Sequence, residues 1–284
     1  MAVELSVKYQ PYVDEKFTRE SKLPLLTNDD FDWTGAKTIK AYKVTTSSMN
    51  DYDRSGTGAN QSRYGVVEGL DATTESFTLR RDRSFTFAVD KLDTDETAMQ
   101  LQGATALERQ LREVVIPEVD SWVYTQMCEG AGHKPVAIAL THENIYDEII
   151  QGSCTLDNDE VVEQGRFLIV SPNTYLLMKK NPLITMETNI NDSLRATGVI
   201  ALVDGMNVVK VPANRVPAGF GFLIGHPCAT VAPKKLEEYK VHNSPPGISG
   251  DLVEGRINYD AFVLENKACA LYYQAVTDTK QKSK

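Results

Sequence analysis

The side chains able to do acid–base or metal chemistry are scattered along this 284-residue chain. The nearest set that could bind a metal is Cys128, His133, His142 and Cys154, and its spacing matches no zinc template. No Cys-x-x-Cys pair occurs, which favours reduced and mostly buried thiols. We therefore predict no metal and no cofactor. The four cysteines are Cys128, Cys154, Cys228 and Cys269.

Carboxylates and glycines also fail to form a catalytic pattern. The acidic runs at 27–30 and 157–160 read as solvated loops, because a catalytic acid needs burial or a like-charged neighbour to tune its pKa. The glycine-containing stretches 56–60 and 219–225 lie in a polar loop and an apolar strand, so neither brings amides to a helix start. No nucleophile elbow, metalloprotease, P-loop or dinucleotide motif is present. We predict no catalytic residues and no enzyme.

The net charge of −9 limits the partners. An acidic surface repels phosphate, which argues against tight or sequence-specific nucleic-acid binding but not against a wall that encloses nucleic acid. The cluster Arg80–Arg81–Asp82–Arg83 suggests intersubunit ion pairs more than a nucleic-acid patch, because Asp82 interrupts it. No signal peptide or run of roughly 18 apolar residues appears, which predicts cytoplasmic synthesis and no membrane partner.

Two segments of the first 90 residues look extended. Residues 1–35 read as an arm that lies on another surface, since Leu23, Leu25 and Leu26 are too apolar for a free tail. The alternative is an ordinary terminal strand or short helix docked on its own domain. Residues 36–90 predict a long β-hairpin with arms 36–46 and 76–90, which alternate polar and apolar residues around a flexible tip. Such a hairpin cannot hold a core of its own.

A long helix is predicted over 93–130. Its apolar residues recur at steps of three and four, Asp93 or Thr94 can cap its start, and Gly130 can end it. Pro117 should kink it, because the proline ring clashes with the carbonyl of Glu113 and removes one hydrogen bond.

The remainder has mixed α/β character. The residues 257–264 and 268–276 predict a closing hairpin, followed by a polar, disordered tail. Together with the long helix, these segments predict an α+β fold. Between 136 and 250 we expect helices at 142–151 and 174–180 and strands at 166–170, 200–203, 208–211 and 220–224.

The order of these segments resembles the HK97-like capsid fold of tailed bacteriophages. The stretches KKLEEYKVHNSPPGISGDLVEGRINYDAFVLENKACALYYQ (234–274) and RFLIVSPNTYLLMKK (166–180) are similar to major capsid proteins from phages of Gram-positive bacteria. The resemblance implies a division of the chain into an N-terminal arm (N-arm, 1–35), an E-loop hairpin (36–90), the spine helix region of the P-domain (91–135), mainly A-domain (136–250), closing strands of the P-domain (251–277) and a disordered tail (278–284).

The same resemblance implies a structural subunit of an icosahedral phage head. Such subunits self-assemble as pentamers and hexamers to enclose double-stranded DNA without sequence-specific binding. The expected partners are other copies of the chain, a separate scaffolding protein and a portal, and the expected location is the virion. The alternatives are an encapsulin-like nanocompartment shell, another phage structural protein, and a cytosolic α/β enzyme. Some relatives crosslink through an E-loop lysine, but Lys37, Lys40 and Lys43 match that position too loosely to carry the chemistry over.

Overall fold

The computed structural model describes residues 21–28, 38–44, 46–55, 62–65, 69–96, 102–184 and 199–277. The chain divides into two compact units, Trp33–Leu79 and the remainder, Met1–Asp32 with Arg80–Lys284, and each is described by itself. The predicted tail 278–284 and most of the predicted arm 1–35 lie outside the described residues.

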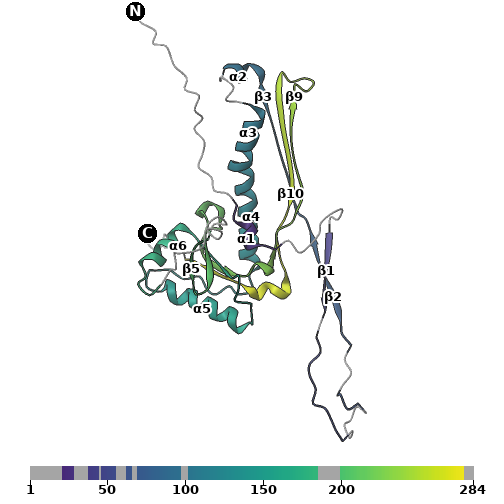
Figure 1. Ribbon diagram of the computed structural model, residues 1–284, viewed down its shortest axis with the longest axis vertical. Coiled ribbons are helices and arrows are strands. Elements are labelled where there is room, and N and C mark those ends of the chain that lie inside the picture. Colours follow the sequence, from purple (N-terminus) through teal and green to yellow (C-terminus); the bar gives the residue numbers. More distant parts are fainter. Residues whose placement is uncertain are drawn as a thin grey trace, which may run out of the picture. The chain divides into compact units, whose positions relative to one another are not determined.

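The longest helical element of the larger unit runs from 103 to 130 (Figure 1). It consists of α3 (Gly103–Gln110), a π-helical turn η1 (Leu111–Val115) and α4 (Ile116–Gly130). The expected kink at Pro117 stays a prediction, but the π-helical turn ends two residues before this proline, which lies in the first turn of α4. Wider hydrogen bonding there accommodates a residue that has no N–H to donate. A separate short helix, α2 (Lys91–Glu96), precedes the long one.

A three-stranded antiparallel sheet lies beside this helix, in the order β3-β10-β9 (Figure 1). Its strands are β3 (Arg81–Asp90), β9 (Lys234–Asn243) and β10 (Gly250–Tyr259). The predicted hairpin arm 76–90 is therefore wrong as one strand. The strand is interrupted at residues 79–80. Its longer part, β3, pairs with β10, which lies 160 or more residues further along the chain, instead of with 36–46. Alternation along a strand does not specify the strand's partner.

A five-stranded sheet forms the centre of the larger unit, in the order β12-β7-β4-β6-β5. Leu168 and Val170 of β4 pack with α5 and α6 on one face, while Phe167 and Ile169 pack with α4 on the other. Both faces are covered, so β4 is apolar at every position. The elements are β4 (Phe167–Val170), β5 (Val199–Val203), β6 (Met206–Lys210), β7 (Phe220–Gly225), β12 (Leu271–Ala275), α5 (Ile145–Asn158) and α6 (Pro172–Lys180).

These elements confirm most of the strands and both short helices expected between 136 and 225, although α5 continues to residue 158. The closing hairpin is wrong. β10 pairs with β3 and β9, whereas β12 pairs with β7 in the other sheet. A 3-10 helix, η4 (Glu265–Ala270), separates them, so residues 265–267 are not a hairpin turn. The remaining short elements are η2 (Ala213–Arg215), η3 (Pro227–Ala229), β8 (Thr230–Val231) and β11 (Phe262–Val263).

Residues 21–28 dock on their own unit. The helix α1 (Leu23–Leu26) buries Leu23 and Leu26 in the same core as α4. Asn28 then forms a β-bridge with Val231. For this short stretch, docking on the chain's own domain is the alternative that the structure confirms, because two leucines gain more from burial than from exposure on an arm.

The smaller unit contains a two-stranded antiparallel ribbon of β1 (Thr38–Val44) and β2 (Ala72–Thr78). The first arm of the predicted hairpin, 36–46, is confirmed as a strand over 38–44, and the start of the second arm is confirmed over 76–78. In the described residues of the whole chain, no helix is both long enough and apolar enough to cross a lipid bilayer.

Candidate functional site

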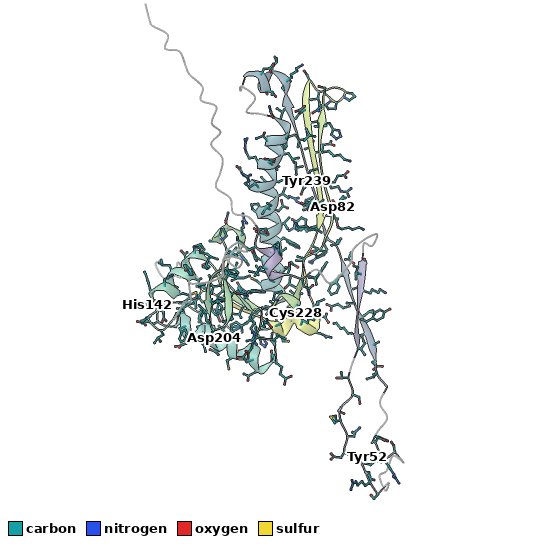
Figure 2. The ribbon with its side chains drawn as sticks, viewed as in Figure 1. Tyr52, Asp82, His142, Asp204, Cys228 and Tyr239 are labelled. Atoms are coloured by element: carbon teal, nitrogen blue, oxygen red, sulfur yellow. The ribbon has the colours of Figure 1, made fainter. Side chains whose placement is uncertain are left out.

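The side chains that could have formed a catalytic or metal site lie apart from one another. His133 pairs with Asp159 at 2.5 Å, whereas His142 lies 3.9 Å from Glu143. Figure 2 shows His142 and Cys228 in different parts of the larger unit. The described residues contain no group of three histidine, cysteine or carboxylate side chains that could hold a metal ion. All four cysteines are free, but only Cys128 is buried and Cys154 is exposed, so the expectation of mostly buried thiols is wrong.

The acidic and glycine-containing stretches have structural roles where they are described. Asp157 pairs with the buried Arg166 at 2.6 Å, and Arg166 also donates to the carbonyl oxygens of Val161 and Val162. Residues 219–225 contribute the buried strand β7. The loop stretch 56–60 lies outside the described residues. These contacts connect the end of α5 and the loop after it to the start of β4.

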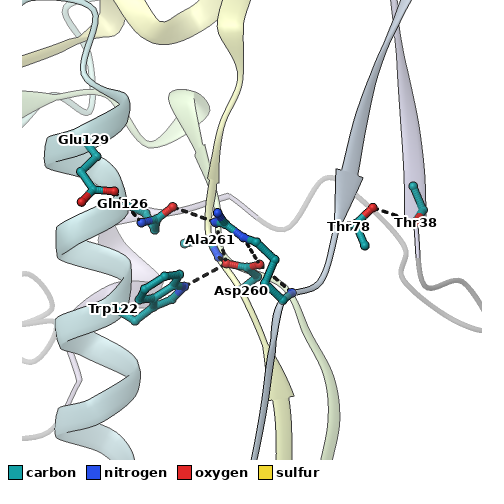
Figure 3. A network of polar contacts seen from close by, with 8 residues as sticks. Thr38, Thr78, Trp122, Gln126, Glu129, Asp260 and Ala261 are labelled. Carbon is teal, nitrogen blue, oxygen red and sulfur yellow. Dashed lines mark hydrogen bonds and ion pairs between the residues drawn. The ribbon is translucent and has the colours of Figure 1, made fainter.

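One polar junction organises the meeting point of β3, α4 and the end of β10 (Figure 3). The carboxylate of Asp260 accepts hydrogen bonds from Nε1 of Trp122 at 2.9 Å and from the backbone amide of Ala261 at 2.9 Å. It also accepts from the backbone amide and the guanidinium of Arg80, at 2.9 and 3.0 Å. Arg80 in turn donates to Gln126 of α4 at 2.8 Å. A single buried carboxylate thus joins three elements that are distant in sequence.

The hydrogen bonds determine the charge state of Asp260. Burial by itself would raise the pKa of this carboxyl group, but the donors from Arg80, Trp122 and the two backbone amides outweigh it and hold the pKa below its ordinary value. Asp260 is therefore a fully ionised structural anchor at neutral pH, with no spare lone pair directed to solvent for proton transfer.

The basic cluster at 80–83 is directed into its own subunit. Arg81 lies over the ring of Trp122, with 3.8 Å to the ring centroid, and Arg83 pairs with Glu118 at 2.7 Å. Asp82 pairs with Arg256 on the neighbouring strand at 2.6 Å. Within the subunit these side chains therefore already have ion-pair or aromatic partners, and the expected intersubunit ion pairing stays a prediction. A sequence shows the cluster, but folding supplies its partners from residues 35 to 180 positions away.

A second junction is almost fully buried and joins α4 to the N-terminal segment. Asp120 of α4 forms an ion pair with Arg215 at 2.7 Å, and Ser21 donates to the same carboxylate at 2.6 Å. Burial raises the pKa of Asp120, and the hydrogen bonds from Ser21 and Arg215 offset this only in part. No sequence pattern indicated this pair, because one aspartate in a helix and one isolated arginine are ordinary surface residues.

The outer face of the β3-β10-β9 sheet is charged, with both signs interspersed. Asp82, labelled in Figure 2, belongs to this face together with Arg256 and Glu254. His242 pairs with Glu254 at 3.3 Å, and Lys240 contacts Glu238. The pairs are exposed, so each contributes little to stability. Mixed charges of this kind keep a broad surface soluble while leaving it able to match a partner.

The ribbon of the smaller unit exposes an apolar and aromatic surface. Tyr42 and Val44 of β1 are 78% and 61% exposed, and Met49 is 99% exposed. Tyr52, labelled in Figure 2, packs edge-on against Tyr64, with 5.1 Å between ring centroids. A two-stranded ribbon is marginal alone, and an exposed surface of this composition is typical of a site for protein contact.

Comparison with known proteins gives matches to solved structures but none to protein-family models or curated proteins. The capsid structure of the cyanophage P-SCSP1u matches with a TM-score of 0.72 and 12% identity, over 97% of this chain and 94% of that one. The mature capsid of bacteriophage PhiM1 matches with a TM-score of 0.71 and 13% identity, over 97% and 93%. A structure from Mycobacterium phage Che8 matches with a TM-score of 0.68 and 15% identity, over 95% and 97%. The predicted α+β capsid fold is confirmed: this chain has the fold of the phage capsid structures that it matches.

Proposed function

We propose that this chain is the major capsid protein of a tailed bacteriophage, a structural subunit that assembles with other copies as pentamers and hexamers around double-stranded DNA. The observation that supports it most is the coverage of the structural matches, which extend over nearly the whole of both chains. A fold alone does not specify a function. In this case the scattered chemistry of the described residues adds independent support for a structural rather than an enzymatic role.

The same proposal assigns each part of the structure to a domain of the capsid fold. The smaller unit with β1 and β2 is the E-loop, α2 to α4 with the β3-β10-β9 sheet belongs to the P-domain, and the five-stranded sheet with α5 and α6 belongs to the A-domain. This division differs from the expected one in three strands. β3 lies in the expected E-loop range 36–90 and β9 in the expected A-domain range 136–250, but both now belong to the P-domain, whereas β12 lies in the expected P-domain range 251–277 and now belongs to the A-domain. Other proposed partners are a separate scaffolding protein and a portal, and the proposed location is the virion after synthesis in the host cytoplasm.

Electron microscopy of the purified full-length chain, alone and together with its scaffolding protein, tests the proposal. Isometric particles or capsomer rings are expected. A monomer or small dimer in both samples would contradict a shell role. Particles that hold a protein cargo instead of DNA when made in cells would favour the encapsulin-like alternative, which has the same kind of shell.

The role proposed for the E-loop has its own test. Replacing residues 45–71 by Asn-Gly keeps the pair Val44↔Ala72 and closes β1 and β2 with a two-residue turn. We expect normal folding of the larger unit, measured by circular dichroism and thermal unfolding, and no particles in electron micrographs. Normal particles from this variant would refute the role of the loop in assembly without affecting the assignment of the fold.

A further inference from the structure

The segments around the five-stranded sheet are divided by the sign of their charge. The stretch 143–165, which contains α5 and the loop after it, has acidic residues but no lysine or arginine. The stretch 167–184, which contains β4 and α6, has Lys179 and Lys180 but no acidic residue. One subunit therefore presents two surfaces of opposite sign, and each can attract a partner of the other sign.

The basic surface lies where β4 and β6 end. These two strands are parallel, and Lys210, the last residue of β6, pairs with Val170, the last residue of β4. The ring of Tyr175, in α6, contacts two lysines, with 5.1 Å from its centroid to Nζ of Lys210 and 5.6 Å to Nζ of Lys179. Leu176, the next residue of α6, is 53% exposed. The basic patch, which we define as Tyr175, Leu176, Lys179 and Lys210, thus combines two cations with apolar surface.

The acidic surface lies at the opposite end of the same two strands. Arg166 immediately precedes β4, and its carbonyl oxygen accepts a hydrogen bond from the amide of Asn207, near the start of β6. The side chain of Arg166 donates to the carbonyl oxygen of Val162 and holds the preceding loop at this end. In this loop Glu160 and Glu163 are exposed, and Val162 is 62% exposed. The acidic patch, which we define as Glu160, Val162 and Glu163, thus combines two anions with an apolar residue.

The charges of the two patches are not neutralised within the subunit. In the part of the chain that the structure describes, no carboxylate forms an ion pair with Lys179 or Lys210. Among the same residues, no cation forms an ion pair with Glu160 or Glu163. The four residues of β4 separate the two ends of the sheet by about 13 Å. Each patch is therefore left with charges that a second molecule can match.

We propose that the basic patch of one copy binds the acidic patch of the next copy, so that subunits join head to tail. The inference rests on the proposed function and deepens it, because it names a contact within the pentamers and hexamers. A contact between two different surfaces leaves one unused patch at each end of a row, and the row stops growing when a ring closes. Leu176 of one copy meets Val162 of its neighbour in this contact, and the charged pairs surround them.

Zero-length crosslinking tests the contact directly. A carbodiimide joins a carboxylate to an amine that touches it and adds no spacer. Rings assembled from an equal mixture of unlabelled and isotope-labelled chains are treated, digested and analysed by mass spectrometry. We expect peptides of mixed isotope content in which Glu160 or Glu163 is joined to a lysine of the basic patch. Lys267, an exposed lysine of η4, is the matched control and should give no such product with either glutamate.

Reversal of the charges tests whether the two patches recognise each other. Lys179→Glu/Lys210→Glu should abolish the rings, because an acidic surface then faces another acidic surface. Glu160→Lys/Glu163→Lys should abolish them in the same way. A chain with all four changes should form rings again, because its two ends are once more complementary. Recovery of this kind distinguishes a contact between the patches from damage to the fold, which further changes would not repair.

Lys235→Glu/Lys267→Glu makes the same change in net charge as reversal of the basic patch and should leave the rings intact, since both lysines are exposed outside the two patches. Circular dichroism verifies that every variant is folded, and electron microscopy detects the rings. Equal loss of rings in this control would mean that total charge, and not the patches, governs assembly, and would overturn the inference.

The remaining outcomes separate the inference from the proposed function. Normal rings from either pairwise reversal, or no rings from the folded fourfold variant, would overturn the contact and leave the proposed function intact. Rings of the unmodified chain without crosslinks between the two patches would do the same. Absence of rings and particles from the unmodified chain, alone and with its scaffolding protein, would overturn both.

Discussion

The rings of Phe85 and Tyr239 stack 6.1 Å apart across Gly255, which lies between them on the central strand of the β3-β10-β9 sheet. A glycine has no side chain to separate the two rings. The rings cover the backbone there and supply the packing that the glycine lacks. The helix-facing side of the sheet thus depends on three residues that are up to 170 positions apart.

Replacing Gly255 by alanine should therefore destabilise the subunit. A Cβ atom at this position would lie 2.4 Å from Cε1 and Cζ of Phe85 and 2.9 Å from Cδ1 of Tyr239. We expect a loss of about 1–3 kcal/mol in the free energy of unfolding, measured by urea denaturation. Gly69→Ala is the matched control, because nothing lies within 4 Å of a Cβ there. Equal stability of the two variants would show that the rings move aside at no cost.

Asp260→Asn should weaken the junction of β3 and α4 in a way that depends on pH. The pKa of Asp260 is lowered in the folded state, so its ionised form stabilises the fold above about pH 4, the ordinary value for an aspartate, and this contribution disappears as the pH falls through the folded pKa. We expect a loss of about 1–3 kcal/mol at pH 7 and a smaller loss near pH 3.

Urea midpoints at the two pH values measure this difference, with the exposed Glu163→Gln as control. A penalty that does not change with pH would mean that Asp260 acts through its shape and not through its charge.

The carboxyl group of Asp120, which pairs with Arg215, should make the stability of the unmodified protein depend on pH in the opposite sense to Asp260. Arg215→Met leaves the carboxylate buried without its cation and should cost about 3–5 kcal/mol at pH 7. Because burial raises the pKa of Asp120, the folded state retains this proton more strongly than the unfolded chain, and stability falls as the pH rises above about 4. The cost of Arg215→Met should therefore be smaller at pH 4 than at pH 7.

The double variant Asp120→Leu/Arg215→Met completes the cycle. With both charges gone, most of the loss should be recovered, as measured by denaturant midpoints of all four proteins. If the double variant is as unstable as the two single changes added together, the two side chains do not act as a pair.

Pro117→Ala should remove the reason for the π-helical turn. With an N–H at 117, regular α-helical bonding can continue through 111–116, and loss of the extra residue of the π turn would rotate α3 by up to about 100° relative to α4. In an assembled shell we expect a changed particle size distribution, measured by electron microscopy. Pro172→Ala, at the first turn of α6, is the control, because proline is well tolerated there. Particles of one unchanged size would show that Pro117 does not influence the curvature of the shell.

Periodicity and local residue preferences determined a large part of this protein. The stripe of apolar residues predicted the long helix. Ser171–Pro172 marked the end of the strand at 166–170, and Asp204–Gly205, which both have positive φ, marked the turn between β5 and β6. These features succeed because hydrogen bonding within a helix or across a tight turn depends on neighbours in sequence.

Only the tertiary structure decided the strand partners and the buried charges. Residues 81–90 and 257–259 look the same in sequence whether they pair locally or with a distant strand, since a period of two specifies a face but no partner. Asp260, Asp120 and Arg215 became junction residues because folding removed them from water and placed donors around them. That desolvation arises from segments separated by 95 to 180 residues, and no spacing within a single segment reports it.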